Sequence, residues 1–233
     1  MIFGAFFKAL GQTGDRRFRR VLFLGVGLTL ALLVAVYAGF LWLLQALTGD
    51  TATLPLIGEV TWLDDLLGWS SLLLMMILSV FLMIPVASAI TSMFLDEVAQ
   101  AVEDKHYPHL PPAPKVPFWD SVKDTVNFMG LLIGANTVAL FLYLIPVLTP
   151  FSLFIFWGLN GFLLGMEYFT LAAIRRVGRV GAKDLRKKHR GKIWLAGTLM
   201  AMPLTLPLVN LVIPILGAAT FTHIFHGVTG GRR

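Results

Sequence analysis

The sequence contains no cysteine among its 233 residues, and only 14% of them are charged. The lack of cysteine excludes disulfide bonds and thiolate metal sites, and it gives no clue to the redox compartment. A soluble domain carries about 25% charged residues, whereas 57% of this chain is hydrophobic. These proportions predict a single all-α integral membrane domain over 1–233.

Catalytic signatures are also missing. The sequence has no nucleophile-elbow, zinc-protease or phosphate-loop pattern. The pair His106/His109 lies in a proline-rich stretch, and the pair His223/His226 has no nearby carboxylate or cysteine in the sequence, so metal binding is not expected. We therefore predict that the chain is not an enzyme and carries no cofactor and no metal.

Long uncharged runs alternate with short polar segments. Residues 21–47 form a run of 27 uncharged residues, which exceeds the ~20 that a transmembrane helix needs. Before it, residues 1–20 combine an amphipathic helix with a basic helix entry. Residues 66–95 are again uncharged, and their amphipathic continuation predicts one long helix over 66–105, bent at Pro85. Glu103 is expected on the polar face of that continuation.

Prolines divide the second half of the chain into two helical hairpins. A connector at 106–117 holds five prolines in twelve residues, so it should be extended rather than helical. The hairpins are expected at 126–171 and 193–226, each with a proline-bracketed turn, and a basic segment at 175–192 separates them. Transporters use such interrupted pairs to place backbone groups at membrane depth. Whether the arms cross fully or dip and return is left open by their lengths.

The distribution of positive charge predicts the topology. All 19 lysines and arginines lie in residues 1–20, 105–123, 175–192 and 232–233, and none lies in 49–65. Cytoplasmic segments carry the excess of Lys and Arg. Both termini are therefore predicted to be cytoplasmic and 49–65 to face outward. The net charge of +6 is split among apolar runs, which fits an anionic membrane surface better than nucleic acid.

Two polar groups are candidate sites. Residues 14–20 place Gly14 and four arginines, Arg16, Arg17, Arg19 and Arg20, at the start of the first span. Free N–H groups, the positive end of the helix dipole and guanidinium forks together suit an oxyanion. The alternative is that these arginines only contact lipid phosphates. Asn160 and Glu167 share a face inside an uncharged stretch and form a candidate intramembrane polar site. For them the alternatives are interhelical hydrogen bonding by Asn160 and pairing of Glu167 with Arg175 or Arg176.

Three stretches resemble the CysZ sulfate permease family. Residues 12–18, QTGDRRF, resemble the Gly-apolar-Arg-Arg-Phe element that opens the family's first long helix. Residues 84–98, IPVASAITSMFLDEV, resemble its second long helix. Residues 202–220, MPLTLPLVNLVIPILGAAT, resemble its C-terminal hairpin. One position departs, because Asp15 stands where the family has an apolar residue. A carboxylate there is expected to cap the helix and to repel an anion.

The resemblance implies two long transmembrane helices plus two pairs of shorter, hemi-penetrating helices, assembled as an oligomer. It implies a transporter or ion channel of the bacterial inner membrane that supplies sulfate for cysteine biosynthesis. It also assigns sulfate binding to Gly14, Arg16 and Arg17, while Arg19 and Arg20 remain candidates for lipid phosphate or secondary anion contact. Flux would be passive or ion-coupled. The alternative function is a non-transporting membrane scaffold that binds anionic lipids.

Overall fold

The computed structural model describes residues 1–48, 53–54, 58–59, 93–114, 118–206, 209 and 211–230. The regular secondary structure within them is helical apart from β1 (Thr53–Leu54) and β2 (Gly58–Glu59), which pair antiparallel. The predicted all-α fold class is therefore confirmed. Two helical stretches, Arg16–Phe40 and Thr149–Lys188, are long and apolar enough to cross a membrane.

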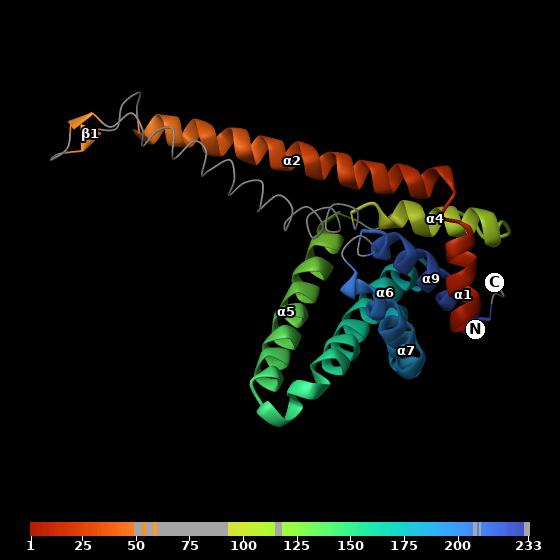
Figure 1. The fold of residues 1–233 in the computed structure, drawn as a ribbon. Coiled ribbons are helices and arrows are strands. Elements are labelled where there is room, and N and C mark those ends of the chain that lie inside the picture. Colours follow the sequence, from red (N-terminus) through yellow and green to blue (C-terminus); the bar gives the residue numbers. More distant parts are fainter. Residues whose placement is uncertain are drawn as a thin grey trace.

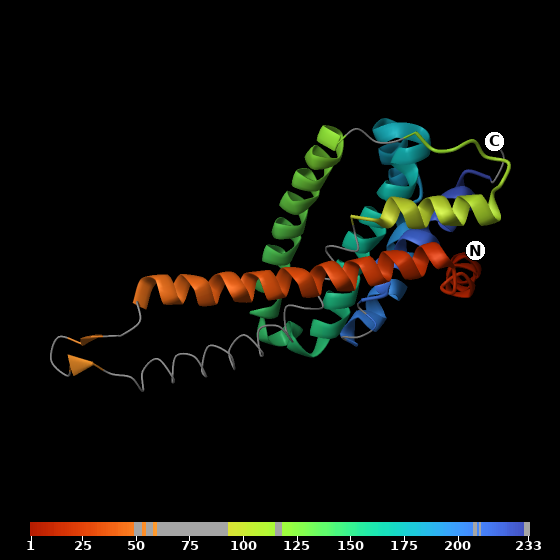
Figure 2. The same cartoon turned by 90° about the horizontal axis from the view of Figure 1, so that it is seen from above.

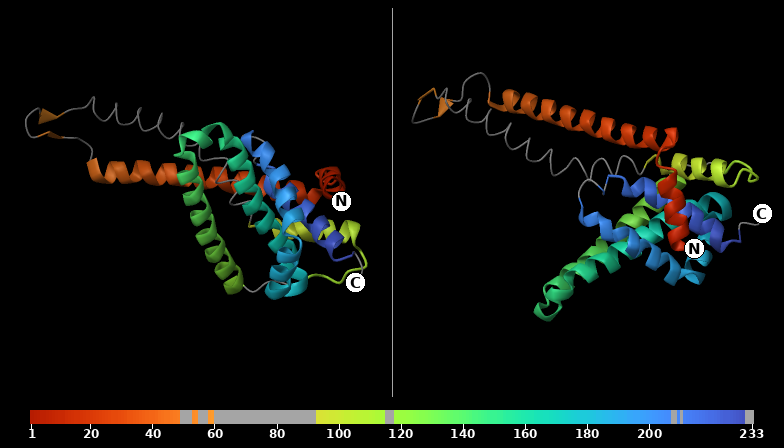
Figure 3. Two further views of the ribbon diagram at one scale, coloured as in Figure 1. Left: turned by 90° about the horizontal axis from the view of Figure 1, so that it is seen from below. Right: turned by 45° about the vertical axis from the view of Figure 1, so that its right-hand side comes forward.

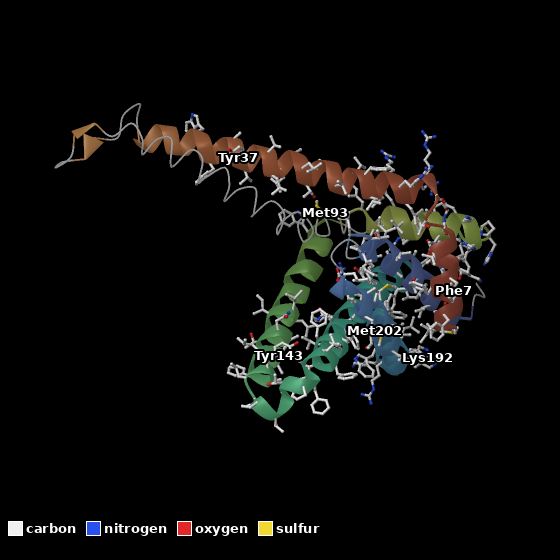
Figure 4. All side chains as sticks on the ribbon, viewed as in Figure 1. Phe7, Tyr37, Met93, Tyr143, Lys192 and Met202 are labelled. Carbon is white, nitrogen blue, oxygen red and sulfur yellow. The ribbon has the colours of Figure 1, made fainter. Side chains whose placement is uncertain are left out.

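The first span extends away from the other helices. This span lies in α2 (Arg16–Thr48), which follows α1 (Ile2–Gly11) in the chain. Helix α2 has 33 residues and is about 50 Å long. Its first turns pack on the helical body through Phe18 and Val21, both buried. Beyond them α2 leaves the body, and Tyr37 lies on this distal part (Figures 1 and 4). Its exposed side chains here are apolar, Phe23 and Val34 among them, as lipid contact requires.

The predicted helix over 66–105 is described only at its end, by α4 (Leu95–His106). Met93 and Phe94 form a turn directly before α4, so one unbroken helix through this point is not what the structure shows. Asp96 and Glu97 occupy the first turn of α4, where their charges complement the positive end of a helix dipole. Residues 66–92, with the predicted bend at Pro85, lie outside the described residues. After α4, residues 107–114 are non-helical, as their prolines predict.

The first hairpin consists of α5 (Phe118–Tyr143), the 3₁₀ turn η1 (Pro146–Phe151) and α6 (Ser152–Lys188). The two helices form a V joined at η1 (Figure 2). Helix α5 begins eight residues before the predicted hairpin start at 126, and α6 continues through much of the basic segment. A break at Gly178, with φ 67°, interrupts α6; only glycine adopts this φ without steric cost. Helix α5 has 26 residues, about 39 Å, but its apolar part, Gly130–Tyr143, is shorter than a span needs.

The second hairpin repeats the order helix, 3₁₀ turn, helix. It consists of α7 (Arg190–Ala201), η2 (Met202–Thr205) and α9 (Ile213–Val228), while Pro207 and Asn210 lie outside the described residues. Helix α7 has only 12 residues, about 18 Å, which is too short to span. The backbone of α7 lies against α6, because an added Cβ at Gly197 would collide with the backbone of Gly161.

Helix α9 forms the centre of the body. Every residue from Ile213 to His226 is buried, and α1, α4 and α6 pack around it. A helix that is apolar on all sides is expected in such a core position. The N-terminus and the end of α9 lie together beside α1 and α4 (Figure 3). This packing brings the start of α2, the end of α4 and α6 into one neighbourhood.

Candidate functional site

The turn between α1 and α2 holds the predicted anion residues. Asp15 immediately precedes α2, and the backbone N–H of Arg17 donates to its Oδ1 at 2.9 Å. This is the predicted helix cap, and it occupies one of the free N–H groups of the helix start. Gly14 is exposed, and a Cβ added to it would meet no atom within 4 Å. The turn therefore leaves the backbone of Gly14 open to an approaching ligand.

Gln12 fixes this turn to α4. Its side chain is buried, and its Nε2 donates to the carbonyl oxygen of Ala101 at 3.0 Å and to Asp15 Oδ2 at 3.2 Å. Burial opposes ionisation of Asp15, but the bonds from Arg17 N–H and Gln12 lower the pKa of Asp15. Asp15 is thus held as an anion at the mouth of α2.

The four arginines of this segment are all exposed: Arg16, Arg17, Arg19 and Arg20. One of them has a close partner, since Arg17 Nη1 donates to Asp104 Oδ2 on α4 at 2.6 Å. A pocket of about 230 Å³ opens beside this pair, lined by Arg17, Arg20, Glu97 and Gln100. Hydrogen bonds from Gln100 and Arg17 lower the pKa of Asp104. The structure therefore brings Arg17 and Arg20 to one pocket, together with acidic groups that sequence reasoning had not placed there.

A buried ion cluster lies behind this pocket. Glu103 is only 2% exposed. Arg176 donates two hydrogen bonds to its carboxylate, from Nε to Oε1 at 2.9 Å and from Nη2 to Oε2 at 2.7 Å. Arg175 Nη2 lies 3.5 Å from Oε2, and His226 Nε2 lies 3.0 Å from Oε1. Burial alone would raise the pKa of Glu103, but these hydrogen bonds and charges lower it to about 2. An ionised carboxylate only accepts, so His226 Nε2 carries the hydrogen.

The position predicted for Glu103 on the polar face of its helix is wrong. It follows the buried Ala99 by four residues and so shares that residue's buried face. The spacing was visible in the sequence, but the partner arginines lie more than 70 residues away. Only the packing of α6 and α9 on α4 shows that this carboxylate is neutralised inside the body.

Gln100 connects the exposed pocket with the buried cluster. Its Nε2 donates to Asp104 Oδ1 at 2.7 Å, and its Oε1 accepts from Arg175 Nη2 at 2.6 Å. A continuous chain of polar contacts therefore runs from Arg17 through Asp104 and Gln100 to Arg175, which also reaches Glu103. The start of α2 is thereby coupled to α6 through one face of α4.

The predicted intramembrane pair lies on α6. Asn160 is half-buried and donates from Nδ2 to the carbonyl oxygen of Phe156 on the same helix, so the described structure shows an intrahelical bond for it. Glu167 is also half-buried, and within the described ranges it forms no ion pair with Arg175 or Arg176, which contact Glu103 of α4 instead. Among the described residues no group of three or more His, Asp or Glu side chains is arranged to hold a metal.

Comparison with known protein families gives a match over most of the chain. The family model described as "Sulfate transporter CysZ/Etoposide-induced protein 2.4" matches residues 5–214. The match includes the turn before α2, both hairpin turns and the buried cluster up to Arg176. No curated protein matches the chain.

Proposed function

This chain belongs to the sulfate transporter CysZ/etoposide-induced protein 2.4 family, and from that premise we propose that it carries sulfate, or a related oxyanion, across the bacterial inner membrane. The sulfate would be assimilated into cysteine. We further propose that the protein works as a homo-oligomer, as a passive channel or an ion-coupled transporter. Its membrane nature follows from the family and from its two apolar spans.

One observation carries the proposal: Gly14 lies exposed in the turn before a spanning helix, and the exposed Arg16 and Arg17 are the first two residues of that helix. Sulfate would bind the open backbone of Gly14 and the forks of Arg16 and Arg17. Asp104 already contacts Arg17, so the anion has to displace it. That pair is about half exposed, and exposed pairs contribute roughly 0–1 kcal/mol. Each charge-assisted bond to sulfate is worth roughly 1.5–3 kcal/mol, so the anion prevails.

Calorimetric titration with sulfate tests this site. Arg17→Lys keeps the charge but loses the two-pronged fork, so sulfate affinity should fall about ten-fold or more. Arg19→Lys is the matched control, because Arg19 is exposed and does not line the pocket, and it should bind within about two-fold of the wild type. Gly14→Val should fold normally, because nothing lies near its Cβ, and yet bind weakly. Equal affinity in all four proteins would show that the arginines only anchor the membrane surface.

The orientation is proposed from charge and is tested by labelling. With no native cysteine, Thr53→Cys and Lys183→Cys each carry one thiol. An impermeant reagent added outside should modify the first and spare the second, because the basic segment is proposed to be cytoplasmic. Lys183 suits this test because it is exposed, whereas the neighbouring Ala182 is buried. The reverse pattern would invert the proposed topology.

A non-transporting scaffold that binds anionic lipids is the second candidate. The observation that favours it is the occupation of the α2 start by the chain's own carboxylates, Asp15 and Asp104. In this case Arg19 and Arg20 would contact lipid phosphates and sulfate would find no site. The calorimetric titration separates the two functions, because only the transporter binds sulfate through Arg17.

A further inference from the structure

A second basic pocket lies between α6 and α7, and its lining includes none of the residues assigned to sulfate. Its volume is about 450 Å³. The floor is apolar, formed by Phe162 and Met166 of α6 and by Ile193 and Trp194 of α7. Neither the sulfate proposal nor the family description uses this pocket.

Three cationic side chains form one rim of this pocket: Arg186, Lys187 and Arg190. Arg186 is held in place, because its Nη1 donates to Thr170 Oγ1 at 2.9 Å. Lys187 and Arg190 are exposed, and no ion pair is formed by either within the described part of the chain. The rim of the pocket is therefore positively charged and lies beside an apolar surface.

The apolar floor includes two exposed aromatic side chains. Trp194 is 47% exposed, and its indole Nε1 donates to the carbonyl oxygen of Gly158 at 2.9 Å, which fixes the ring against α6. Phe162, also on the floor, is 46% exposed. Tryptophan favours the membrane–water interface, where an apolar ring meets polar headgroups. Cations beside an exposed indole are the side chains that contact lipid headgroups at this interface.

We propose that this pocket binds one anionic phospholipid, with its phosphate on Lys187, Arg190 and Arg186 and an acyl chain along Phe162 and Trp194. The positive rim suits the negative charge of a phosphodiester, and the apolar floor suits a hydrocarbon chain. Free phosphate or sulfate would leave that floor uncovered. A lipid there would bridge α6 and α7 at the base of the second hairpin. The site does not depend on sulfate transport and is compatible with either candidate function.

Quenching of Trp194 fluorescence tests the site. The protein is reconstituted in phosphatidylcholine vesicles that contain a few per cent of either brominated phosphatidylglycerol or brominated phosphatidylcholine. Bromine on the acyl chain quenches tryptophan on contact, and subtraction of the Trp194→Phe signal isolates Trp194 from the other tryptophans. The anionic lipid should quench Trp194 more strongly than the zwitterionic one at equal fraction.

Two double variants separate a site from diffuse attraction. Lys187→Gln/Arg190→Gln should lose the preference for the anionic lipid by roughly thirty-fold, if each cation contributes about 1 kcal/mol. Lys183→Gln/Lys188→Gln removes the same charge from the same segment but outside the pocket, and it should keep the preference. Equal loss in both variants, or equal quenching of wild type by both lipids, would overturn the proposal.

Discussion

Replacing Glu103 with glutamine tests how the end of α4 is held in the body. The substitution keeps the side-chain shape and removes the charge. Arg176, whose side chain is 13% exposed, is then left buried without its anion. Arg175, 7% exposed, keeps only the exposed Asp96, whose Oδ1 lies 3.9 Å from its Nε. Removing one partner of a buried ion pair costs roughly 3–5 kcal/mol. The lowered pKa of Glu103, about 2 against 4.5, corresponds independently to about 3 kcal/mol.

The assay is thermal unfolding of purified protein in detergent. A loss of 3–5 kcal/mol in a protein of this size should lower the unfolding midpoint by on the order of 10 °C. Asp104→Asn is the matched control, because it removes the same charge one residue later from an exposed pair with Arg17. It should shift the midpoint by no more than about 3 °C. Similar shifts in both variants would refute the view that burial makes the Glu103 cluster strong.

Three further outcomes follow from the structure. Gly197→Val should destabilise the protein by about 1–3 kcal/mol or more in the same thermal assay, because the new side chain would overlap α6. Gly134→Ala is the control and should have little effect, because no atom lies within 4 Å of an added Cβ there. The stability that the Glu103 carboxylate contributes should be complete above pH 4.5 and be lost as pH falls toward 2. Unfolding midpoints measured across this pH range should show this loss in the wild type and lack it in Glu103→Gln. Asp104→Asn should raise sulfate affinity up to about five-fold in calorimetry, since Arg17 no longer has a competing carboxylate; weaker binding would mean that Asp104 positions Arg17 for the anion.

Helices and their breaks were largely readable from the sequence. Uncharged runs predicted α2, and the prolines at 146 and 150 predicted the turn that the structure shows as η1. The cap by Asp15 was also predicted, because Asp at a helix start bonds the N–H two residues on. These features depend on local chemistry, which acts over a few residues and is therefore written in the sequence.

The partners of the charged groups were not readable in the same way. The carboxylate of Glu103 pairs with Arg176 and His226, which lie 73 and 123 residues away. No local pattern chooses these partners; the packing of α4 against α6 and α9 does. The same holds for Asp104, whose bond to Arg17 crosses from α4 to α2. Sequence reasoning found the arginines at the start of α2 but not the acidic side chains beside them.

Uptake of labelled sulfate into sealed liposomes tests the central claim most directly. Wild-type protein should admit sulfate faster than empty vesicles, and Arg16→Ala/Arg17→Ala should reduce uptake to near the empty-vesicle level. Lys183→Ala/Lys188→Ala removes the same charge away from the turn and should retain uptake. Wild-type uptake no faster than that of empty vesicles would contradict transport, and full uptake by the Arg16→Ala/Arg17→Ala variant would contradict the site at the start of α2.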